Sequence, residues 1–313
     1  MSITAFLFPG QGSQVVGMAS ALTQSSQIAK DILSEIDDAL EFKLSVLMAE
    51  GPAADLQLTE NAQPALFASS ICTLRVLQDH TGKAIHELCS YVAGHSLGEY
   101  SALCAAGSLG IAETASLLRL RGQSMQQAVP VGEGAMAALI GADLALAEEI
   151  VSVSSDAGLV QIANDNAYGQ IVLSGASSGI DRAMDVAKQK GLRRVVRLPV
   201  SAPFHCQMMA PAANVMSQAL ADIEFQDAEV PVVQNVTVEP EKSADILRDN
   251  LVSQVTSRVR WRETMMYFKH AAVTDFVELG TGRVLSGLAK RAAPDSKIYT
   301  LDTLDDVLAY LGK

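Results

Sequence analysis

The sequence is poor in aromatic residues and in positive charge, and it contains no long hydrophobic run. Aromatic residues make up 5% of the 313 residues, and 23 Lys and Arg stand against 35 Asp and Glu, which gives a net charge of −12. An acidic chain lacks the Lys/Arg surplus on which nonspecific binding to nucleic acid or to anionic membranes depends. No segment approaches the roughly 18 continuous apolar residues of a membrane span, and the first residues lack the basic region of a secretory leader. We therefore expect no nucleic-acid partner, no membrane partner and no targeting segment.

Cysteine is also scarce. The four cysteines, Cys72, Cys89, Cys104 and Cys206, show neither C-x-x-C nor C-x-H spacing. Scattered thiols of this kind are typical of a reducing compartment and do not form a metal-ligand pattern. We expect a cytoplasmic protein with reduced thiols and without a metal site.

Aliphatic residues, in contrast, are abundant. Hydrophobic residues make up 49% of the chain and charged residues 19%, so the chain can bury a sizeable core and is not disordered. Short apolar runs at 3–8 and 89–94 alternate with helical patterns at 64–80, 97–106 and 111–128. Strands that alternate with helices of this length predict a parallel α/β sheet covered on both faces.

Residues 128–198 have a different pattern. Strand-like and helical segments follow one another in the order βαββαβ, at 135–140, 144–151, 160–164, 170–174, 180–187 and 194–198. This is the order of the split ferredoxin-like motif. The α/β pattern resumes after Pro231, so the sequence predicts an α/β domain formed by 1–127 and 199–313, with a ferredoxin-like subdomain at 128–198 inserted into it.

The sharpest local motif is a G-x-S-x-G at 94–98 that joins a predicted strand to a predicted helix. A serine on such a turn projects its hydroxyl above the edge of the sheet, because the flanking glycines relieve crowding. The first amides of the following helix point to the same space and can stabilise an oxyanion. We interpret Ser96 as a nucleophile; a glycine-flanked turn with an incidental serine is the alternative.

A serine nucleophile needs a base, and the sequence contains five histidines. His205 follows a proline-containing turn just past the predicted subdomain, and functional side chains concentrate in loops held by a scaffold. The alternatives are His80, His86, His95 and His270. An acid between serine and histidine in chain order is typical of α/β-hydrolases. By order the candidates are Asp143, Asp156 and Asp165, which all fall in the predicted insertion, so the residues alone place no acid convincingly.

Two further features allow two interpretations each. The turn Pro9-Gly10-Gln11-Gly12 lacks the third glycine of a dinucleotide-binding loop and the Lys of a P-loop, so it is either a structural turn or a means of bringing the Gln11 amide beside Ser96. Arg121 lies in a mostly apolar helix. It is either an ordinary surface arginine or a buried guanidinium that grips a substrate carboxylate with two parallel hydrogen bonds.

Together these segments resemble bacterial malonyl-CoA:acyl carrier protein transacylases. The matching segments run in family order over nearly the whole chain: FPGQGSQ at 8–14, NAQPAL at 61–66, AGHSLGEYSAL at 93–103, RLRGQSMQ at 119–126, PVSAPFH at 199–205, QVTSRVRW at 254–261 and ELGTGRVLSGL at 278–288. The chain departs from the family pattern at Arg258, where many relatives have Pro, and at Thr281, where ELGPG is common.

The resemblance implies an α/β-hydrolase-like core with a parallel sheet and an inserted ferredoxin-like subdomain. It implies that Ser96 is acylated and that His205 is its base, in a dyad whose imidazole is oriented by a backbone carbonyl near Gln254 rather than by an aspartate. The amides of Gln11 and Leu97 would form the oxyanion hole. The expected substrate-binding side chains are Arg121, which would hold the malonyl carboxylate, with Met125, Phe204 and Gln254.

The implied activity is that of an acyl-carrier-protein S-malonyltransferase. By a ping-pong mechanism, malonyl would pass from malonyl-CoA to Ser96 and then to the phosphopantetheine thiol of acyl carrier protein, for fatty acid biosynthesis. No cofactor or metal is expected, because the thioester is already activated, and we expect a monomer. The alternatives are a serine thioesterase or hydrolase on the same elbow, and a malonyltransferase of a malonate decarboxylase or polyketide system.

Acyl carrier proteins are acidic, so an acidic enzyme must offer them a local basic patch. Two basic clusters stand out, and we expect them to dock the carrier protein: Lys188, Lys190, Arg193 and Arg194 in the predicted subdomain, and Lys290 and Arg291 on the helix after Gly282. The alternative is that both are solvated helix ends.

Overall fold

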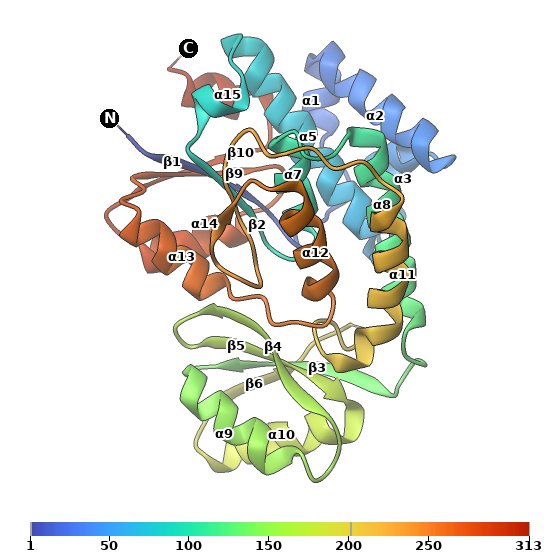
Figure 1. Ribbon diagram of the computed structural model, residues 1–313, viewed down its shortest axis with the longest axis vertical. Coiled ribbons are helices and arrows are strands. Elements are labelled where there is room, and N and C mark those ends of the chain that lie inside the picture. Colours follow the sequence, from blue (N-terminus) through green and yellow to red (C-terminus); the bar gives the residue numbers. More distant parts are fainter. Residues whose placement is uncertain (1, 201, 313) are drawn as a thin grey trace.

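The computed structural model describes residues 2–200 and 202–312, whose strands form two separate sheets (Figure 1). The strands are β1 (Thr4–Phe8), β2 (Tyr91–Gly94), β3 (Gly134–Ile140), β4 (Val160–Ala167), β5 (Gln170–Ala176), β6 (Arg194–Arg197), β7 (Val232–Val233), β8 (Pro240–Glu241), β9 (Asp275–Leu279) and β10 (Lys297–Leu301). The helices are α1 (Ser20–Ser25), α2 (Gln27–Leu40), α3 (Leu44–Glu50), α4 (Ala53–Gln57), α5 (Thr59–Thr81), α6 (Ile85–Leu88), α7 (Gly98–Ala105), α8 (Ile111–Gln127), α9 (Leu144–Ser154), α10 (Ser177–Gln189), α11 (Ala210–Ala221), α12 (Ala244–Gln254), α13 (Trp261–His270), α14 (Val284–Ala292) and α15 (Leu304–Tyr310), with a 3₁₀ turn at Gln207–Met209.

The larger sheet has six strands in the order β10-β9-β1-β2-β7-β8. Its neighbouring strands are parallel except for the short pair β7 and β8, which is antiparallel. The predicted parallel α/β sheet is therefore confirmed. Because parallel sheets need helices on both faces, their central strands are apolar along their whole length, and β1 (TAFLF) is buried at every position.

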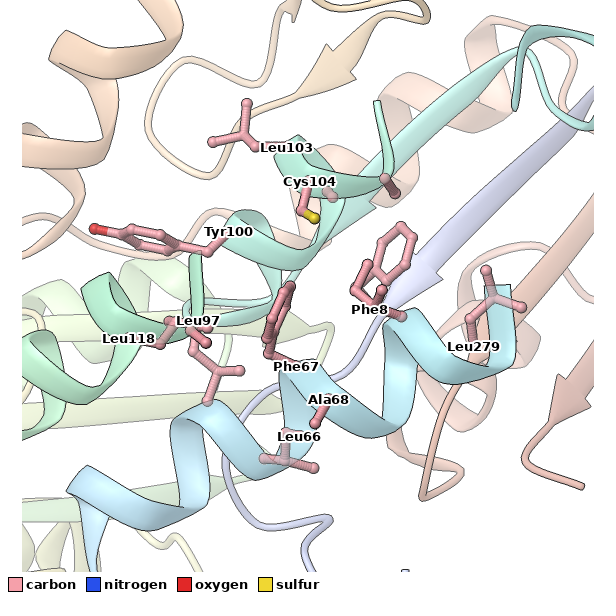
Figure 2. Packing of buried hydrophobic residues seen from close by; sticks show 14 of the residues in the cluster. Phe8, Leu66, Phe67, Ala68, Leu97, Tyr100, Leu103, Cys104, Leu118 and Leu279 are labelled. Atoms are coloured by element: carbon pink, nitrogen blue, oxygen red, sulfur yellow. The ribbon is translucent and has the colours of Figure 1, made fainter. Parts of the chain in front are cut away.

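Side chains of β1 alternate between the two faces of this sheet. Phe6 and Phe8 enter a core cluster with residues of α5, α7 and α8, whereas Ala5 and Leu7 enter a second cluster with residues of α13 and α14. Figure 2 shows part of the first cluster, where Phe67 from α5 lies with Phe8 under α7. The two layers cover both faces of β1 and β2, and the loops that follow these strands carry the candidate site.

The smaller sheet has the strand order β4-β5-β3-β6 and is antiparallel throughout. Helices α9 and α10 supply Ile150, Ile180 and Ala183 to its own small core. This is the predicted βαββαβ ferredoxin-like arrangement, and it lies below the larger sheet in Figure 1. An isolated parallel bridge between Asn164 of β4 and Val259 joins it to the larger part of the chain. The exact boundaries, 127/128 and 198/199, stay a prediction.

Three predicted elements need correction. The helix predicted at 64–80 begins at Thr59, because the N–H groups of Asn61 and Ala62 already bond the Leu58 carbonyl, and Pro64 lies inside the helix rather than at its first turn. The strand predicted at 89–94 begins at Tyr91. The helix after Gly282 is not the last, because β10 and α15 follow it.

The four cysteines are buried and unpaired. Burial raises the pKa of Cys72 and of Cys104 to about 12, so these thiols stay protonated and unreactive near neutral pH. Within residues 2–200 and 202–312, no helix combines the length and apolar character that crossing a bilayer would take.

Candidate active site

Ser96 lies on a sharp turn between β2 and α7, in a left-handed backbone conformation with φ 56°. The flanking glycines are required sterically. A Cβ on Gly94 would lie 1.8 Å from the Gly98 carbonyl oxygen, and a Cβ on Gly98 would lie 2.2 Å from the Phe8 carbonyl oxygen. The glycines therefore let the turn pack against itself and against β1, which leaves the Ser96 hydroxyl free to face the cavity.

The Ser96 hydroxyl donates a hydrogen bond to His205, with 2.7 Å between Oγ and Nε2. On the other side of the ring, Nδ1 donates to the backbone carbonyls of Gln254 and Ser257, at 3.0 and 3.2 Å. Because carbonyl oxygens only accept, these bonds fix the tautomer that leaves Nε2 free to take a proton. Burial, together with the positive charge of Arg121, lowers the pKa of His205 to about 3, so the imidazole is neutral at pH 7.

None of the three candidate acids is a recorded partner of His205; all three lie in the ferredoxin-like part of the chain. Asp143 caps the N-terminus of α9, Asp156 is exposed, and Asp165 is buried in an ion pair with Arg262. Among the described residues, both recorded partners of His205 Nδ1 are backbone carbonyls, in agreement with the dyad that the resemblance implies.

The other histidines have different partners or positions. His95 lines the same cavity, but its Nε2 contacts Asn166 Oδ1 at 2.8 Å. His86 and His270 are exposed, and His80 lies in the last turn of α5.

Arg121 is fully buried in α8, so its interpretation as a surface arginine is wrong. Its Nη1 donates to Gln63 Oε1 at 2.8 Å, and its Nη2 donates to Gln254 Oε1 at 2.8 Å and to Ser96 Oγ at 3.2 Å. The Tyr100 ring lies 5.6 Å from its guanidinium carbon. Burial lowers the pKa of Arg121, but an arginine keeps its charge at neutral pH. The site thus holds a desolvated cation beside the serine.

A cavity of about 470 Å³ opens over these side chains. Its lining includes Gln11, Ser96, Leu97, Arg121, Met125, Phe204 and His205. Gln254 lies behind this wall, where its Oε1 accepts from Arg121 and its Nε2 donates to the Ser96 carbonyl at 3.1 Å. Its side chain therefore orients Arg121 and Ser96 instead of lining the cavity, which differs from its expected place among the substrate contacts.

The two expected oxyanion donors border the cavity from different elements. Gln11 lies in the turn after β1, and Leu97 is the residue before the first turn of α7. In the described part of the chain, neither the Gln11 N–H nor the Leu97 N–H donates a hydrogen bond to another protein group. Two unused donors beside a serine hydroxyl suit a developing oxyanion.

Several buried polar residues of the site were not predicted. Gln63 supports Arg121 from α5, and it belongs to the NAQPAL segment, whose match to the family assigns it no role. Asn235 accepts a hydrogen bond from the Ser96 N–H at 2.8 Å, and Glu99 accepts one from the Asn235 N–H at 2.6 Å. Burial raises the pKa of Glu99 to about 7.

With this geometry established, comparison with known proteins gives the family. A family model described as the acyl transferase domain matches residues 5–292. The chain belongs to this acyl transferase family. Among acyl transferases, the chain is similar to the malonyl CoA-acyl carrier protein transacylase of Bacillus subtilis (strain 168), with 43% identity over 292 residues that cover 93% of this chain and 90% of the relative. The protein of the same name from Escherichia coli (strain K12) is 42% identical over 291 residues, which cover 93% of each chain.

Solved structures of acyl transferases resemble the whole chain. The crystal structure of acyl-carrier-protein-S-malonyltransferase from Bartonella henselae has a TM-score of 0.96 and 49% identity, and the match covers 99% of this chain and 100% of that one. A complex of a type II PKS acyl-carrier protein with its malonyl-transacylase matches with a TM-score of 0.95 and 38% identity, over 99% of each chain. The predicted family and the predicted fold class are both confirmed.

The two departures from the family pattern are accommodated locally. Thr281 is buried, and its hydroxyl lies 2.9 Å from Ser69 Oγ and 2.9 Å from Asp302 Oδ1, so a Thr here adds bonds that a Pro could not make. Arg258 lies 3.5 Å from the carboxylate of Glu263.

Of the two basic clusters expected to dock a carrier protein, one extends from the end of α10 to the start of β6, and the other lies on α14. Lys188 pairs with Asp185 at 3.5 Å, Lys190 pairs with Glu149, and Arg193 and Arg194 are exposed. On α14, Lys290 donates to the Pro294 carbonyl at 3.1 Å and Arg291 donates to Gln170 at 2.8 Å. Arg291 also lines a second cavity of about 390 Å³ together with Arg262, Lys269 and His270.

Proposed function

We propose that this chain transfers a malonyl group from malonyl-CoA to the phosphopantetheine thiol of acyl carrier protein through a malonyl-Ser96 intermediate. The observation that carries the proposal is the position of Arg121, whose Nη2 lies 3.2 Å from the Ser96 hydroxyl while its charge is buried. A malonyl thioester has a terminal carboxylate close to the carbonyl under attack. A fixed cation beside the nucleophile therefore binds the carboxylate and aligns the carbonyl in one step.

In the first half-reaction, His205 Nε2 takes the proton of the Ser96 hydroxyl as Oγ attacks the thioester carbonyl. The N–H groups of Gln11 and Leu97 stabilise the oxyanion of the tetrahedral intermediate. When the intermediate collapses, the C–S bond breaks, and the proton on His205 passes to the departing thiolate of CoA. The malonyl ester of Ser96 remains.

In the second half-reaction, the thiol of the carrier protein's phosphopantetheine arm gives its proton to His205 and attacks the malonyl ester. The C–O bond to Ser96 breaks, and the proton returns from His205 to Ser96 Oγ. The acyl group leaves as a thioester, so the chemical energy of the first thioester is retained. We propose no bound cofactor and no metal in either step.

The electrostatics of the site suit a substrate that carries a negative charge. Arg121 disfavours the imidazolium form of His205, because both would be cations in a buried site. A malonyl carboxylate that pairs with Arg121 cancels this repulsion, so the base is strengthened when the correct substrate is bound. An acetyl group brings no such charge.

The names of the relatives support acyl carrier protein as the acceptor of the malonyl group. Both curated relatives are named malonyl CoA-acyl carrier protein transacylase, and one solved relative is described in complex with an acyl-carrier protein. We propose that the basic side chains of α14 and those of residues 188–194 dock the acidic carrier protein. We also propose that the enzyme works as a monomer and that it acts in the cytoplasm in fatty acid biosynthesis.

The acceptor is tested by following the acyl-enzyme. Enzyme loaded with labelled malonyl-CoA is freed of excess substrate and divided between buffer and buffer with the thiol form of acyl carrier protein. The proposal predicts a label that persists in buffer and moves to the carrier protein on mixing. Rapid release of free malonate in both samples would instead identify a thioesterase.

A further inference from the structure

The turn that carries Ser96 is strained, and it needs support from outside the motif. Ser96 is not a glycine, yet its φ of 56° lies in the left-handed region that side chains rarely adopt. Such a conformation persists only where surrounding contacts hold it. The support must also be precise, because the hydroxyl has to meet both His205 Nε2 at 2.7 Å and an incoming carbonyl carbon.

Asn235, from the segment after β7, supplies this support. Its Oδ1 accepts from the Ser96 N–H at 2.8 Å, and its Nδ2 donates to the Gly94 carbonyl at 2.7 Å. One buried amide thus bridges the last residue of β2 and the nucleophile itself. Asn235 is absent from the lining of the active-site cavity, so it acts on the serine and not on the substrate.

Glu99 in turn fixes Asn235. Its Oε2 accepts from the Asn235 N–H at 2.6 Å, and its Oε1 accepts from Gln234 Nε2 at 3.3 Å. Gln234 Nε2 also donates to the Leu247 carbonyl of α12 at 3.2 Å, and Gln234 Oε1 accepts from Asn250 at 2.8 Å. A continuous set of hydrogen bonds, buried except at Asn250, therefore connects α12, the segment after β7 and the first turn of α7.

We propose that Asn235 is a positioning residue that holds the backbone of Ser96 in its attacking conformation, and that Glu99 holds Asn235 in place. The inference rests on the proposed function, because the step that it affects is the acylation of Ser96. Loss of the amide should slow this step without weakening the binding of malonyl-CoA, since the cavity wall and Arg121 stay intact.

The first test is Asn235→Ala. Single-turnover acylation is followed at saturating malonyl-CoA, and the Kd for malonyl-CoA is measured separately in a Ser96→Ala background. We expect the acylation rate constant to fall on the order of 10²-fold, as for a small misplacement of a reacting group, with an unchanged Kd.

A second variant, Asn235→Asp, gives a signature that a purely structural role would not produce. A protonated carboxyl group has the acceptor and the donor of the amide, whereas an ionised one turns a lone pair toward the Gly94 carbonyl. The ratio of variant to wild-type acylation rates should therefore rise as the pH falls. Glu99, Arg121 and His205 also face this network, so the variant and wild-type rates are measured at each pH and compared as a ratio.

The matched control is Asn61→Ala, another buried asparagine whose amide is bonded on both sides, to the Asp55 carbonyl and to Arg119. It should lower the melting temperature but leave the acylation rate constant unchanged. If wild type is not acylated, the proposed function fails. If wild type is acylated and Asn235→Ala reacts equally fast, the role of Asn235 is refuted. If Asn235→Ala does not fold, a pH-independent rate ratio for Asn235→Asp refutes it.

Discussion

Replacing Arg121 by Ala tests why this site would choose malonyl over acetyl. In the wild type, Arg121 is buried and its guanidinium is held by Gln63 and Gln254, so its position does not depend on the substrate. The Ala variant removes the cation but leaves Ser96, His205 and the oxyanion donors in place. A malonyl carboxylate would then enter a buried site without a partner.

The magnitude follows from the cost of an unpaired buried charge. Removing one partner of a buried ion pair costs about 3–5 kcal/mol. At about 1.4 kcal/mol per factor of ten, kcat/KM for malonyl-CoA should fall by about 10²–10⁴. The orphaned oxygens of Gln63 and Gln254 affect both substrates alike, so the ratio of kcat/KM for malonyl-CoA to that for acetyl-CoA isolates the effect of the charge. This ratio should fall by at least about 10².

The assay measures transfer from malonyl-CoA and from acetyl-CoA to carrier protein for wild type and Arg121→Ala. Arg119→Ala is the matched control, because Arg119 belongs to the same helix but contacts Asn61 and the Phe42 ring. It should leave the ratio unchanged. A folded Arg121→Ala enzyme with the wild-type ratio would refute the assignment of Arg121 to the malonyl carboxylate.

Three further predictions follow from other parts of the site. Because burial and the charge of Arg121 lower the pKa of His205 to about 3, the base stays unprotonated as the pH falls from 8 to about 5, and the NMR signals of the His205 imidazole should not move over this range; a titration of these signals centred near 6.5 would contradict it. Charge reversal at Lys190 or Arg291 should raise the KM for carrier protein and leave acylation by malonyl-CoA unchanged, so an equal effect on both half-reactions would exclude docking there. Phe204 lines the cavity beside His205 and should crowd a substituted α-carbon, so Phe204→Ala should raise transfer of methylmalonyl relative to malonyl, whereas equal wild-type rates with both would refute this role.

The larger elements could be predicted because their patterns are long. Helix α8 and the strands of the ferredoxin-like part have clear periodicity, and they were placed within a few residues. Short elements contain too few residues to show a hydrophobic periodicity from which they could be predicted. Helices α1, α3 and α4 have 6, 7 and 5 residues, and β8 has 2, so these elements are set by tertiary contacts instead.

Some residues of the site could also be predicted from the sequence, and others could not. The glycine-flanked turn predicts Ser96 as a nucleophile from the residues alone, whereas the choice of His205 among five histidines, its orientation by a carbonyl near Gln254 and the role of Arg121 come from the family resemblance. Gln63 and Asn235 could not be predicted, because their contacts join distant segments: Gln63 and Arg121 are 58 positions apart, and Ser96 and Asn235 are 139 apart. Glu99 was visible within the GHSLGEYSAL segment, but nothing in the sequence shows that its carboxylate faces Asn235.

The proposed mechanism requires that malonyl-CoA acylates Ser96 and that the acyl group then passes to carrier protein. Intact-protein mass spectrometry after addition of malonyl-CoA tests this requirement directly, with wild type and Ser96→Ala side by side. We expect a wild-type mass increase of one malonyl group, no increase for Ser96→Ala, and loss of the increase when carrier protein with its phosphopantetheine thiol is added. A wild-type mass that does not change, or a Ser96→Ala enzyme that is modified equally, would contradict it.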